Sequence, residues 1–295
     1  MTADGGFAED VAFARDIAEE AGRLLYDRYE RVERIDFKSA KDVVTEVDHL
    51  SEDLILGAIR RRFPGDGILA EESGAHQGPG GQPHVHAEGG ATAEAATAAD
   101  TAAAAARSLA SGRTWIVDPV DGTINYANGI PFFCVSVGLV VDGRPAAGAV
   151  HDPMRGETYT AVADGPAWLN DDEIRASSKE ELKDTVVHLA LGGRAVATRG
   201  RAVRKAIRVS RTMGSSALAL AYVANGRFDA FIQSGGMSAW DVAAAGLIAE
   251  RAGALVTDTA GGTWFDVAKA TRGFGLCAAP PAHHAELLRL SGESR

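Results

Sequence analysis

The spacing of apolar residues predicts two amphipathic helices near the start of the chain. The first covers residues 7–30, and its predicted buried face consists of Phe7, Val11, Phe13, Ile17, Leu24 and Leu25. The second covers residues 50–63, with an apolar face of Leu50, Leu54, Ile55, Ala58 and Ile59. A strand follows them, so the predicted opening order is helix, helix, strand.

Apolar runs bounded by turn residues predict strands in the middle of the chain. Residues 132–141 and 146–152 flank the dipeptide Asp142-Gly143, and a further hairpin turns near Asp164-Gly165. Both dipeptides are typical of tight hairpin turns. We therefore expect an antiparallel sheet in this region.

After about residue 183 the pattern alternates between strand and helix. The predicted elements are a strand near 186–191, a helix at 215–225, a strand at 228–232, a helix after Asp241, a strand at 255–257, and a terminal strand and helix. Such alternation indicates stacked layers of helix and sheet in an α/β protein.

Length and composition fit a globular protein with a full hydrophobic core. The 295 residues are 46% hydrophobic and 24% charged, enough for one large domain over residues 1–295, with halves of about 1–182 and 183–295. The formal net charge of −10 argues against binding to nucleic acid or an anionic membrane. A basic run at residues 194–211 is the exception. It could line an anionic substrate, although a solvated helix face is favoured; its cations include Arg199, Arg201, Arg204, Lys205 and Arg208.

The cysteines and the N-terminus favour a cytoplasmic location. Cys134 and Cys277 lie in apolar, strand-like segments and are expected to be buried free thiols. The first residues lack the basic and apolar regions of a signal peptide, and the longest apolar run, near 132–141, is too short to span a bilayer.

Residues 76–112 differ from the rest of the chain in being rich in Gly and Ala. The first half is expected to be flexible, and the second half, about 91–109, has the composition of a surface helix. His76, His84 and His86 have no acidic or cysteine partners nearby, so a mobile lid or linker is favoured over a metal site.

The segment WIVDPVDGT contains two carboxylates three residues apart, Asp118 and Asp121. The apolar run before Asp118 predicts a buried strand that stops at Pro119, which has no N–H for a ladder. The following turn can direct Asp121 and the Val120 carbonyl to the same point. Oxygen ligands without Cys or His favour a hard cation such as Mg²⁺. An ordinary acidic turn remains the alternative.

The next residues and the other acidic segments can each be interpreted as functional or as structural. Gly122 and Thr123, if they open a helix, form a phosphate cradle, and the Thr123 hydroxyl can orient a water. Glu71 and Glu72 follow an apolar run and can face the same cleft. Asp241 and Asp48 each adjoin a predicted helix, where either one could serve only as a cap; they lie in the segments SAWDV and TEVDHL.

Four motifs together resemble the inositol monophosphatase family, the lithium-sensitive, Mg²⁺-dependent phosphatases. They are DVVTEVD at 42–48, AEES at 70–73, WIVDPVDGTINY at 115–126 and SAWDVAAAGLIAERAGA at 238–254. The similarity covers most of the chain. It implies a five-layered αβαβα sandwich, a homodimer, two to three Mg²⁺ ions and hydrolysis of a small phosphate ester.

The resemblance also implies roles for individual residues. Metal ligands would be Glu71, Asp118, the Val120 carbonyl, Asp121 and Asp241, with Asp118 bridging two ions and Glu72 supporting Glu71. Thr123 and Asp48 would polarise the attacking water, so that no covalent phosphoenzyme is needed.

The substrate is less well defined. Inositol-specific relatives carry a glutamate ahead of the Trp-Asp pair, but here FDAFIQSGGMSAWD has none, and either Gln233 or Ser234 takes its place. Gly214 and Ser215, at a helix start, would form the opposite wall or merely an N-cap.

Residues 124–126, Ile-Asn-Tyr, resemble the inositol monophosphatase pattern and favour a sugar or cyclitol phosphate. Fructose 1,6-bisphosphate, histidinol phosphate and adenosine 3′,5′-bisphosphate remain alternative substrates. A metal-binding regulatory protein without turnover is the alternative from another class.

Overall fold

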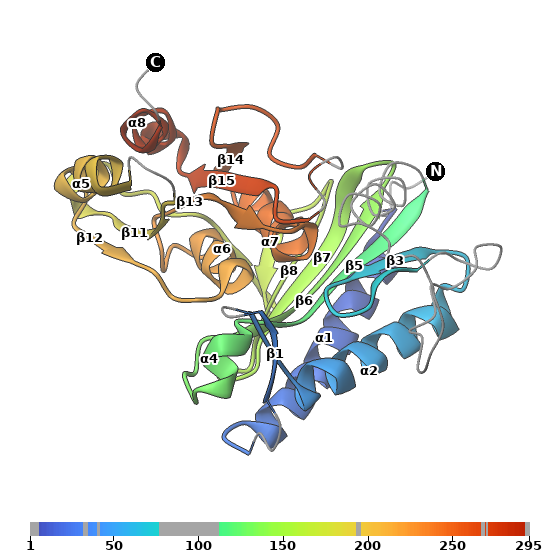
Figure 1. Cartoon of the computed structure of the whole chain (residues 1–295). Helices are drawn as coiled ribbons and strands as arrows, with labels where there is room; N and C mark the ends of the chain where they lie inside the picture. The colour runs from blue at the N-terminus through green and yellow to red at the C-terminus, as the bar shows by residue number, and fades with distance from the viewer. Residues whose placement is uncertain are drawn as a thin grey trace.

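The computed structural model describes residues 6–31, 35–39, 42–76, 112–192, 196–266, 269 and 271–292. Helices and two main sheets alternate in layers through the molecule (Figure 1). The predictions for residues 77–111, including the Ala-rich helix and the roles of His84 and His86, lie outside the described residues.

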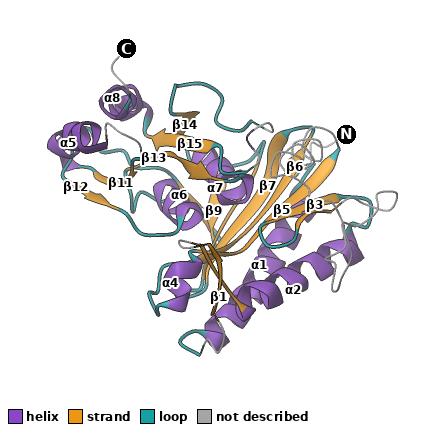
Figure 2. Cartoon of the chain, in the orientation of Figure 1, coloured by secondary structure: helices purple, strands orange, loops and turns teal. Residues whose placement is uncertain are grey.

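The first two layers are a pair of helices and a large sheet. Helices α1 (Ala8–Arg28) and α2 (Glu46–Arg62) pack their apolar faces on one side of an eight-stranded sheet (Figure 2). Its strand order is β10-β9-β8-β7-β6-β5-β3-β4, and among its pairs only β3 and β5 run parallel. The expected antiparallel hairpins are therefore confirmed. The strands are β3 (Gly67–Ala70), β4 (Gly74–His76), β5 (Arg113–Asp121), β6 (Cys134–Val141), β7 (Arg144–Asp152), β8 (Glu157–Val162), β9 (Ala167–Leu169) and β10 (Asp172–Ile174).

The middle layer consists of α6 (Ser216–Ala224) and α7 (Ala239–Arg251), which fill the space between the sheets. Helix α7 comes unusually close to strand β7. A Cβ added at Gly148 would lie 2.7 Å from the Ala244 Cα, so only glycine lets helix and strand approach so closely. This close contact sets the distance between α7 and the large sheet.

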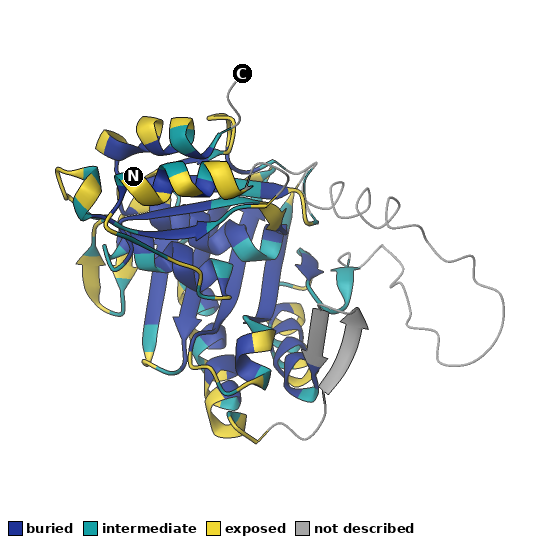
Figure 3. Ribbon diagram, turned by 60° about the vertical axis from the view of Figure 1, so that its left-hand side comes forward, coloured by how far each residue is buried: buried dark blue, intermediate teal, exposed yellow. Residues whose placement is uncertain are grey.

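The last two layers are a second sheet and its outer helices. The sheet order is β12-β11-β13-β15-β14, with β11 parallel to both of its neighbours. Within β13, Phe231 faces the middle layer, whereas Ala230 and Ile232 face the outer helices. The elements are β11 (Val186–Ala190), α5 (Val196–Ala206), β12 (Val209–Arg211), β13 (Ala230–Met237), β14 (Leu255–Asp258), β15 (Phe274–Ala279) and α8 (Pro281–Ser291). The predicted alternation after residue 183 is confirmed, and the fold is the αβαβα sandwich. Figure 3 shows the buried strands between the helical layers.

Several sequence predictions of element bounds were wrong. Strand β5 continues through Pro119 to Asp121, because the proline lies where pairing with β6 is interrupted. Helix α2 begins at Glu46, so that Asp48 lies inside its first turn; likewise α7 begins before Asp241. Pattern reading also missed short elements: β1 (Ile35–Ser39), β2 (Asp42–Thr45), β4, β10, β12 and the 3₁₀ turn η1 (Leu182–Asp184).

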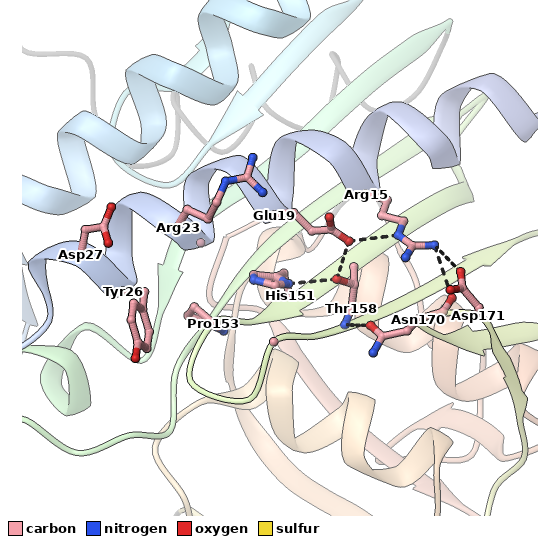
Figure 4. Close-up of a pocket in the computed structure, with 12 residues that line it drawn as sticks. Arg15, Glu19, Arg23, Tyr26, Asp27, His151, Pro153, Thr158, Asn170 and Asp171 are labelled. Atoms are coloured by element: carbon pink, nitrogen blue, oxygen red, sulfur yellow. Dashed lines mark hydrogen bonds and ion pairs between the residues drawn. The ribbon is translucent and has the colours of Figure 1, made fainter.

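A chain of hydrogen bonds joins α1 to the ends of β7 and β8 (Figure 4). Arg15 Nε donates to Glu19, the Thr158 hydroxyl donates to the same Glu19 oxygen at 2.8 Å, and His151 Nδ1 lies 2.9 Å from the Thr158 oxygen. The imidazole also abuts the helix, where a Cβ on Gly22 would come within 2.1 Å of the ring.

Both cysteines, Cys134 and Cys277, are buried and unpaired, as the sequence predicts. Among the described helices, none is both long enough and apolar enough to cross a bilayer.

Candidate metal centre

Strand β5 supplies two carboxylates to one cleft through a bulge. Asp118 pairs with Ser136 and Asp121 with Cys134, so three steps along β5 match two along β6. In a regular strand, side chains three residues apart point to opposite faces; one extra residue brings both to the same side. The Ser51 hydroxyl donates to the Pro119 carbonyl at 3.1 Å and holds this irregular backbone.

Helix α7 adds a third carboxylate from its first turn. The Ser238 N–H donates to Asp241 Oδ2 at 2.5 Å, as in a capping box. One oxygen from each of Asp118, Asp121 and Asp241 lies within 4.8 Å of the others. Asp241 therefore caps α7 and also approaches the other two carboxylates. An ordinary acidic turn at DPVDGT does not account for the approach of all three.

Burial and mutual repulsion raise the pKa values of these groups. The pKa of Asp118 lies well above its ordinary value, mainly because of burial and then because of the neighbouring Glu71 charge. The pKa of Asp241 is raised by burial and by Asp121. The charge of Glu71 thus acts on this site, although Glu71 does not belong to the group of three carboxylates whose oxygens lie within 4.8 Å of one another. A divalent cation would relieve this repulsion. A set of oxygen donors is suited to bind such a cation.

Asp121 is anchored by the N-terminus of α6. Its Oδ2 accepts the Ser215 hydroxyl at 2.5 Å and the Ala217 N–H at 2.7 Å. These bonds oppose the effect of burial, which still raises the pKa of Asp121. Cys134 Sγ lies 3.8 Å from the same oxygen, and burial raises the pKa of that thiol, so it is a neutral neighbour.

Thr123 and Asp48 meet beside the cluster. Thr123 Oγ1 lies 3.1 Å from Asp48 Oδ1 and 3.0 Å from the Val120 carbonyl oxygen. The other Asp48 oxygen accepts the Thr45 N–H at 2.9 Å and the Thr45 hydroxyl at 2.5 Å. Asp48 is therefore both a cap of α2 and a partner of Thr123.

The remaining acidic prediction, Glu72, is nearby. Its charge is among the causes that raise the pKa of Asp48, after burial. Its backbone N–H donates to the Glu52 carboxylate at 2.9 Å, and Glu52 is buried. Sequence reasoning did not single out Glu52, because it has the ordinary appearance of a helical glutamate.

The backbone conformations at positions 122 and 214 both require glycine. Gly122 precedes the short helix α4 (Thr123–Ala127) with a φ of 104°, and Gly214 has a φ of 87°. Asn125 connects the two segments: its Nδ2 donates to the Phe132 carbonyl at 2.6 Å and the Met213 carbonyl at 2.7 Å. This link was missed, although Asn125 lies two residues after Thr123.

The two candidates for the missing glutamate differ in their surroundings. Gln233 Oε1 accepts the Ser216 hydroxyl at 3.2 Å, beside the first turn of α6. The Ser234 hydroxyl oxygen instead accepts the Gly192 N–H at 2.6 Å. Of these two residues, Gln233 is the one that the described structure connects by a hydrogen bond to the helix end that holds Asp121.

Comparison with known proteins identifies the family of this chain. A sequence model of the inositol monophosphatase family matches residues 8–295. The chain belongs to this family.

Its relatives in the inositol monophosphatase family match over most of their length. The chain is 35% identical to Nus factor SuhB of Pasteurella multocida, over 89% of this chain and 88% of the relative. It is also 35% identical to inositol-1-monophosphatase of Mesorhizobium japonicum, over 83% and 84%. Among solved structures, the extragenic suppressor protein suhB of Bartonella henselae superimposes with a TM-score of 0.80 at 28% identity, over 98% of this chain and all of that one.

Inositol monophosphatase family members are phosphomonoesterases, so the protein is a hydrolase of phosphate monoesters. The family is metal-dependent. Among the described residues, one group of three or more His, Cys, Asp or Glu side chains is spaced to hold a metal ion, and it consists of Asp118, Asp121 and Asp241. Their oxygens, two from strand β5 and one from the first turn of α7, suit a hard cation.

Proposed function

We propose that the protein is a Mg²⁺-dependent phosphomonoesterase that hydrolyses a small sugar or cyclitol phosphate with water. The observation that carries this proposal is the convergence of Asp118, Asp121 and Asp241 within 4.8 Å, in a member of a phosphatase family. Bringing three carboxylates together in a buried site is unfavourable unless cations accompany them.

In this proposal the cluster holds two to three Mg²⁺ ions. Glu71, Asp118 and the Val120 carbonyl would ligate one site, with Asp118 bridging to a second site completed by Asp121 and Asp241. Bound Mg²⁺ would neutralise the phosphate dianion, make water more acidic and stabilise the leaving alkoxide. The α6 anchor on Asp121 Oδ2 keeps that carboxylate in place between turnovers.

Thr123 and Asp48 would position the attacking water. When the Thr123 hydroxyl donates to Asp48 Oδ1, its lone pairs are left to accept a hydrogen bond from water. The water oxygen bonds to phosphorus as the bond between phosphorus and the ester oxygen of the substrate breaks. The water passes a proton to the Thr123–Asp48 pair, and the departing ester oxygen takes up a proton from solvent to leave as the alcohol. Thr45 fixes Asp48, and Glu72 would support Glu71.

The phosphate and the alcohol would be held by two glycine-containing turns. Gly122 and Thr123 would offer backbone N–H groups to the phosphate, and Gly214 and Ser215 would form the wall at α6. We assign the usual substrate-contacting position to Gln233 rather than Ser234, because the Gln233 amide lies against Ser216. A neutral amide there can bind a hydroxyl group without a charge.

A regulatory role is the second candidate. Several relatives, including the one from Pasteurella multocida, are named Nus factor SuhB. The corresponding proposal for this chain is a metal-binding protein that acts through an interaction. Retention of every predicted carboxylate favours the hydrolytic proposal.

We also propose that residues 1–295 form one catalytic domain with halves near 1–182 and 183–295, that it assembles as a homodimer, and that it acts in the cytoplasm without nucleic acid or membrane partners. The buried free thiols of Cys134 and Cys277 are consistent with a reducing compartment.

Phosphate release tests the proposal. Inositol 1-phosphate, fructose 1,6-bisphosphate, histidinol phosphate and adenosine 3′,5′-bisphosphate are assayed with Mg²⁺ and with a chelator. We expect Mg²⁺-dependent release that is fastest with a sugar or cyclitol phosphate. A folded, Mg²⁺-binding protein that is silent with all four would favour the regulatory candidate.

A further inference from the structure

Helix α1 and the ends of β7 and β8 border a cavity of about 610 Å³ (Figure 4). Ligand pockets in proteins usually have volumes of roughly 300–1,000 Å³, so this cavity is large enough for a molecule of monosaccharide size. None of the described residues that line it belongs to the proposed metal site. The cavity therefore needs an explanation of its own.

His151 lines this cavity and provides a hydrogen-bond acceptor. The residue is 7% exposed, and burial lowers its pKa to about 4, so the ring is neutral near pH 7. The Thr158 hydroxyl uses its one proton to bond Glu19, so its oxygen must accept a proton from Nδ1 of His151. The other ring nitrogen, Nε2, therefore carries a lone pair, and it has no hydrogen bond to any described residue.

Glycine at position 22 leaves space beside Nε2. A Cβ there would lie 2.6 Å from this nitrogen, so a side chain on this residue of α1 would fill that space. Gly22 lines the cavity together with His151. The lone pair of Nε2 therefore lies at the part of the cavity wall where α1 has no side chain.

Glu19 provides a second acceptor on the same wall. Its Oε1 atom accepts hydrogen bonds from both Arg15 and Thr158, whereas its Oε2 atom has none from the described residues. Burial raises the pKa of Glu19, but the hydrogen bonds from Arg15 and Thr158 outweigh burial, and the pKa lies below its ordinary value. The carboxylate is therefore ionised and has one oxygen available to a ligand.

Acidic side chains outnumber basic ones around the cavity. Three carboxylates and two guanidiniums line it: Glu19, Asp27 and Asp171 against Arg15 and Arg23. Arg15 pairs with Glu19 at 3.0 Å and with Asp171 at 3.2 Å, so its charge is already compensated. The balance of charge favours a ligand with a positive group over one with a negative group.

Two further polar groups suit hydroxyls on the ligand. The Asn170 side-chain oxygen accepts the Thr158 N–H at 2.8 Å, which leaves the NH₂ group of the same amide to donate to a ligand oxygen. Tyr26 adds a phenol hydroxyl to the lining. The cavity therefore combines acceptors for a cationic donor with groups that bind neutral hydroxyls.

We propose that this cavity binds a small hydroxylated primary amine, an amino alcohol or an amino sugar, whose donor groups bond His151 Nε2 and the Glu19 carboxylate. An ammonium group is a donor without an acceptor, and so is matched to a neutral imidazole nitrogen and an ionised carboxylate. The site is additional to the proposed phosphatase function and does not depend on it.

Matched ligand pairs test this inference by NMR titration at pH 7. Ethanolamine is compared with ethylene glycol, and 6-amino-6-deoxyglucose with glucose, so that each pair differs only by an ammonium group in place of a hydroxyl. Mg²⁺ is present throughout, to compete with the amines for the acidic cluster. We expect at least one amine to bind about tenfold more tightly than its alcohol, as is typical of a hydrogen bond to a charged group. The pair with the larger ratio identifies the frame.

Variants assign the preference to this cavity. Glu19→Gln and His151→Phe should each remove most of the preference for the amine. Glu20→Gln, an equal charge change at an exposed position of α1 that does not line the cavity, should leave it unchanged. Arg23→Gln should not weaken amine binding, because it removes a positive charge from the cavity lining. Circular dichroism and thermal unfolding check that each variant is folded.

Equal affinities for amine and alcohol in both wild-type pairs would overturn the inference, as would a preference that survives in Glu19→Gln and His151→Phe. An equal loss in Glu20→Gln would also overturn it, because the effect would then come from net charge. Weaker amine binding in Arg23→Gln would contradict the assigned charge of the ligand. Phosphate release tests the phosphatase function separately, so the two proposals can fail independently.

Discussion

Ser215 and Asp121 share a 2.5 Å hydrogen bond that joins the start of α6 to the end of β5. The serine also caps its own helix, because its oxygen accepts the Leu218 N–H at 3.2 Å. A single hydroxyl thus fixes both a helix terminus and a proposed metal ligand.

Ser215→Ala should therefore weaken both the metal site and the helix. We expect Mg²⁺ affinity to fall on the order of tenfold, as is typical when a residue that orients a ligand is lost, and stability to fall by about 1 kcal/mol. Calorimetric titration and thermal unfolding measure the two effects. Ser216→Ala is the matched control, because its hydroxyl bonds Gln233 and not Asp121; an equal loss of Mg²⁺ affinity there would contradict the anchoring role.

Asn125→Asp should destabilise the protein more than Asn125→Ala. The amide donates to two carbonyls, and a carboxylate of the same shape would place negative charge against both. Leaving buried acceptors unpaired costs on the order of 1–3 kcal/mol, and repulsion adds to this in the Asp variant. Thermal unfolding checks the order. Asn128→Asp, which removes one amide bond to the Ile124 carbonyl at an exposed position, should lower the midpoint less.

Gly148→Ala should lower the free energy of unfolding by about 1–3 kcal/mol, the usual cost of overpacking. The added methyl would overlap the Ala244 backbone of α7, which cannot move aside as a flexible side chain would. The control is Gly65→Ala, where an added Cβ meets nothing within 4 Å. Equal unfolding midpoints for the two variants would show that α7 can shift.

Stability should fall as the pH drops below about 6.5. Burial lowers the pKa of His188 to about 4, so the unfolded chain takes up its proton first, and the stabilising effect of the neutral ring is lost as pH falls from 6.5 toward 4. At pH 5 the loss is about 2 kcal/mol for this residue. The Nδ1 atom of His188 is buried and has no hydrogen-bond partner among the described residues, and the ring stacks on Phe231.

Thermal unfolding of His188→Phe between pH 7 and pH 5 tests this expectation. The variant should lose less stability than the wild type over that interval. His151, whose pKa burial also lowers to about 4, should account for part of the remaining slope. His49→Gln, at an exposed site, serves as control. An unchanged slope in His188→Phe would show that this ring does not titrate as proposed.

The carboxylate cluster could be predicted from sequence because its chemistry is local to short motifs. Asp118 and Asp121 flank a proline, and Asp241 follows a tryptophan at a helix start, so residue types and spacing already indicated an oxygen site. The bulge could not be predicted: periodicity places a break at Pro119, whereas pairing with β6 and the Ser51 hydroxyl carry the strand onward.

Long-range contacts account for most of what sequence reasoning missed. Asn125 bonds a carbonyl 88 residues away, and Glu52 bonds the Glu72 N–H; neither contact leaves a periodic signal. The choice between Gln233 and Ser234 for the substrate-contacting position was open in the sequence. It took the packing of β13 against α6 to place the glutamine amide beside Ser216.

Anomalous diffraction from crystals soaked in Mn²⁺ tests the central claim most directly. We predict at least two peaks between Asp118, Asp121 and Asp241, at about 2.2 Å from carboxylate oxygens, and loss of the bridged peak in Asp118→Asn. Anomalous peaks that lie only elsewhere, with these three carboxylates free of metal, would contradict the account.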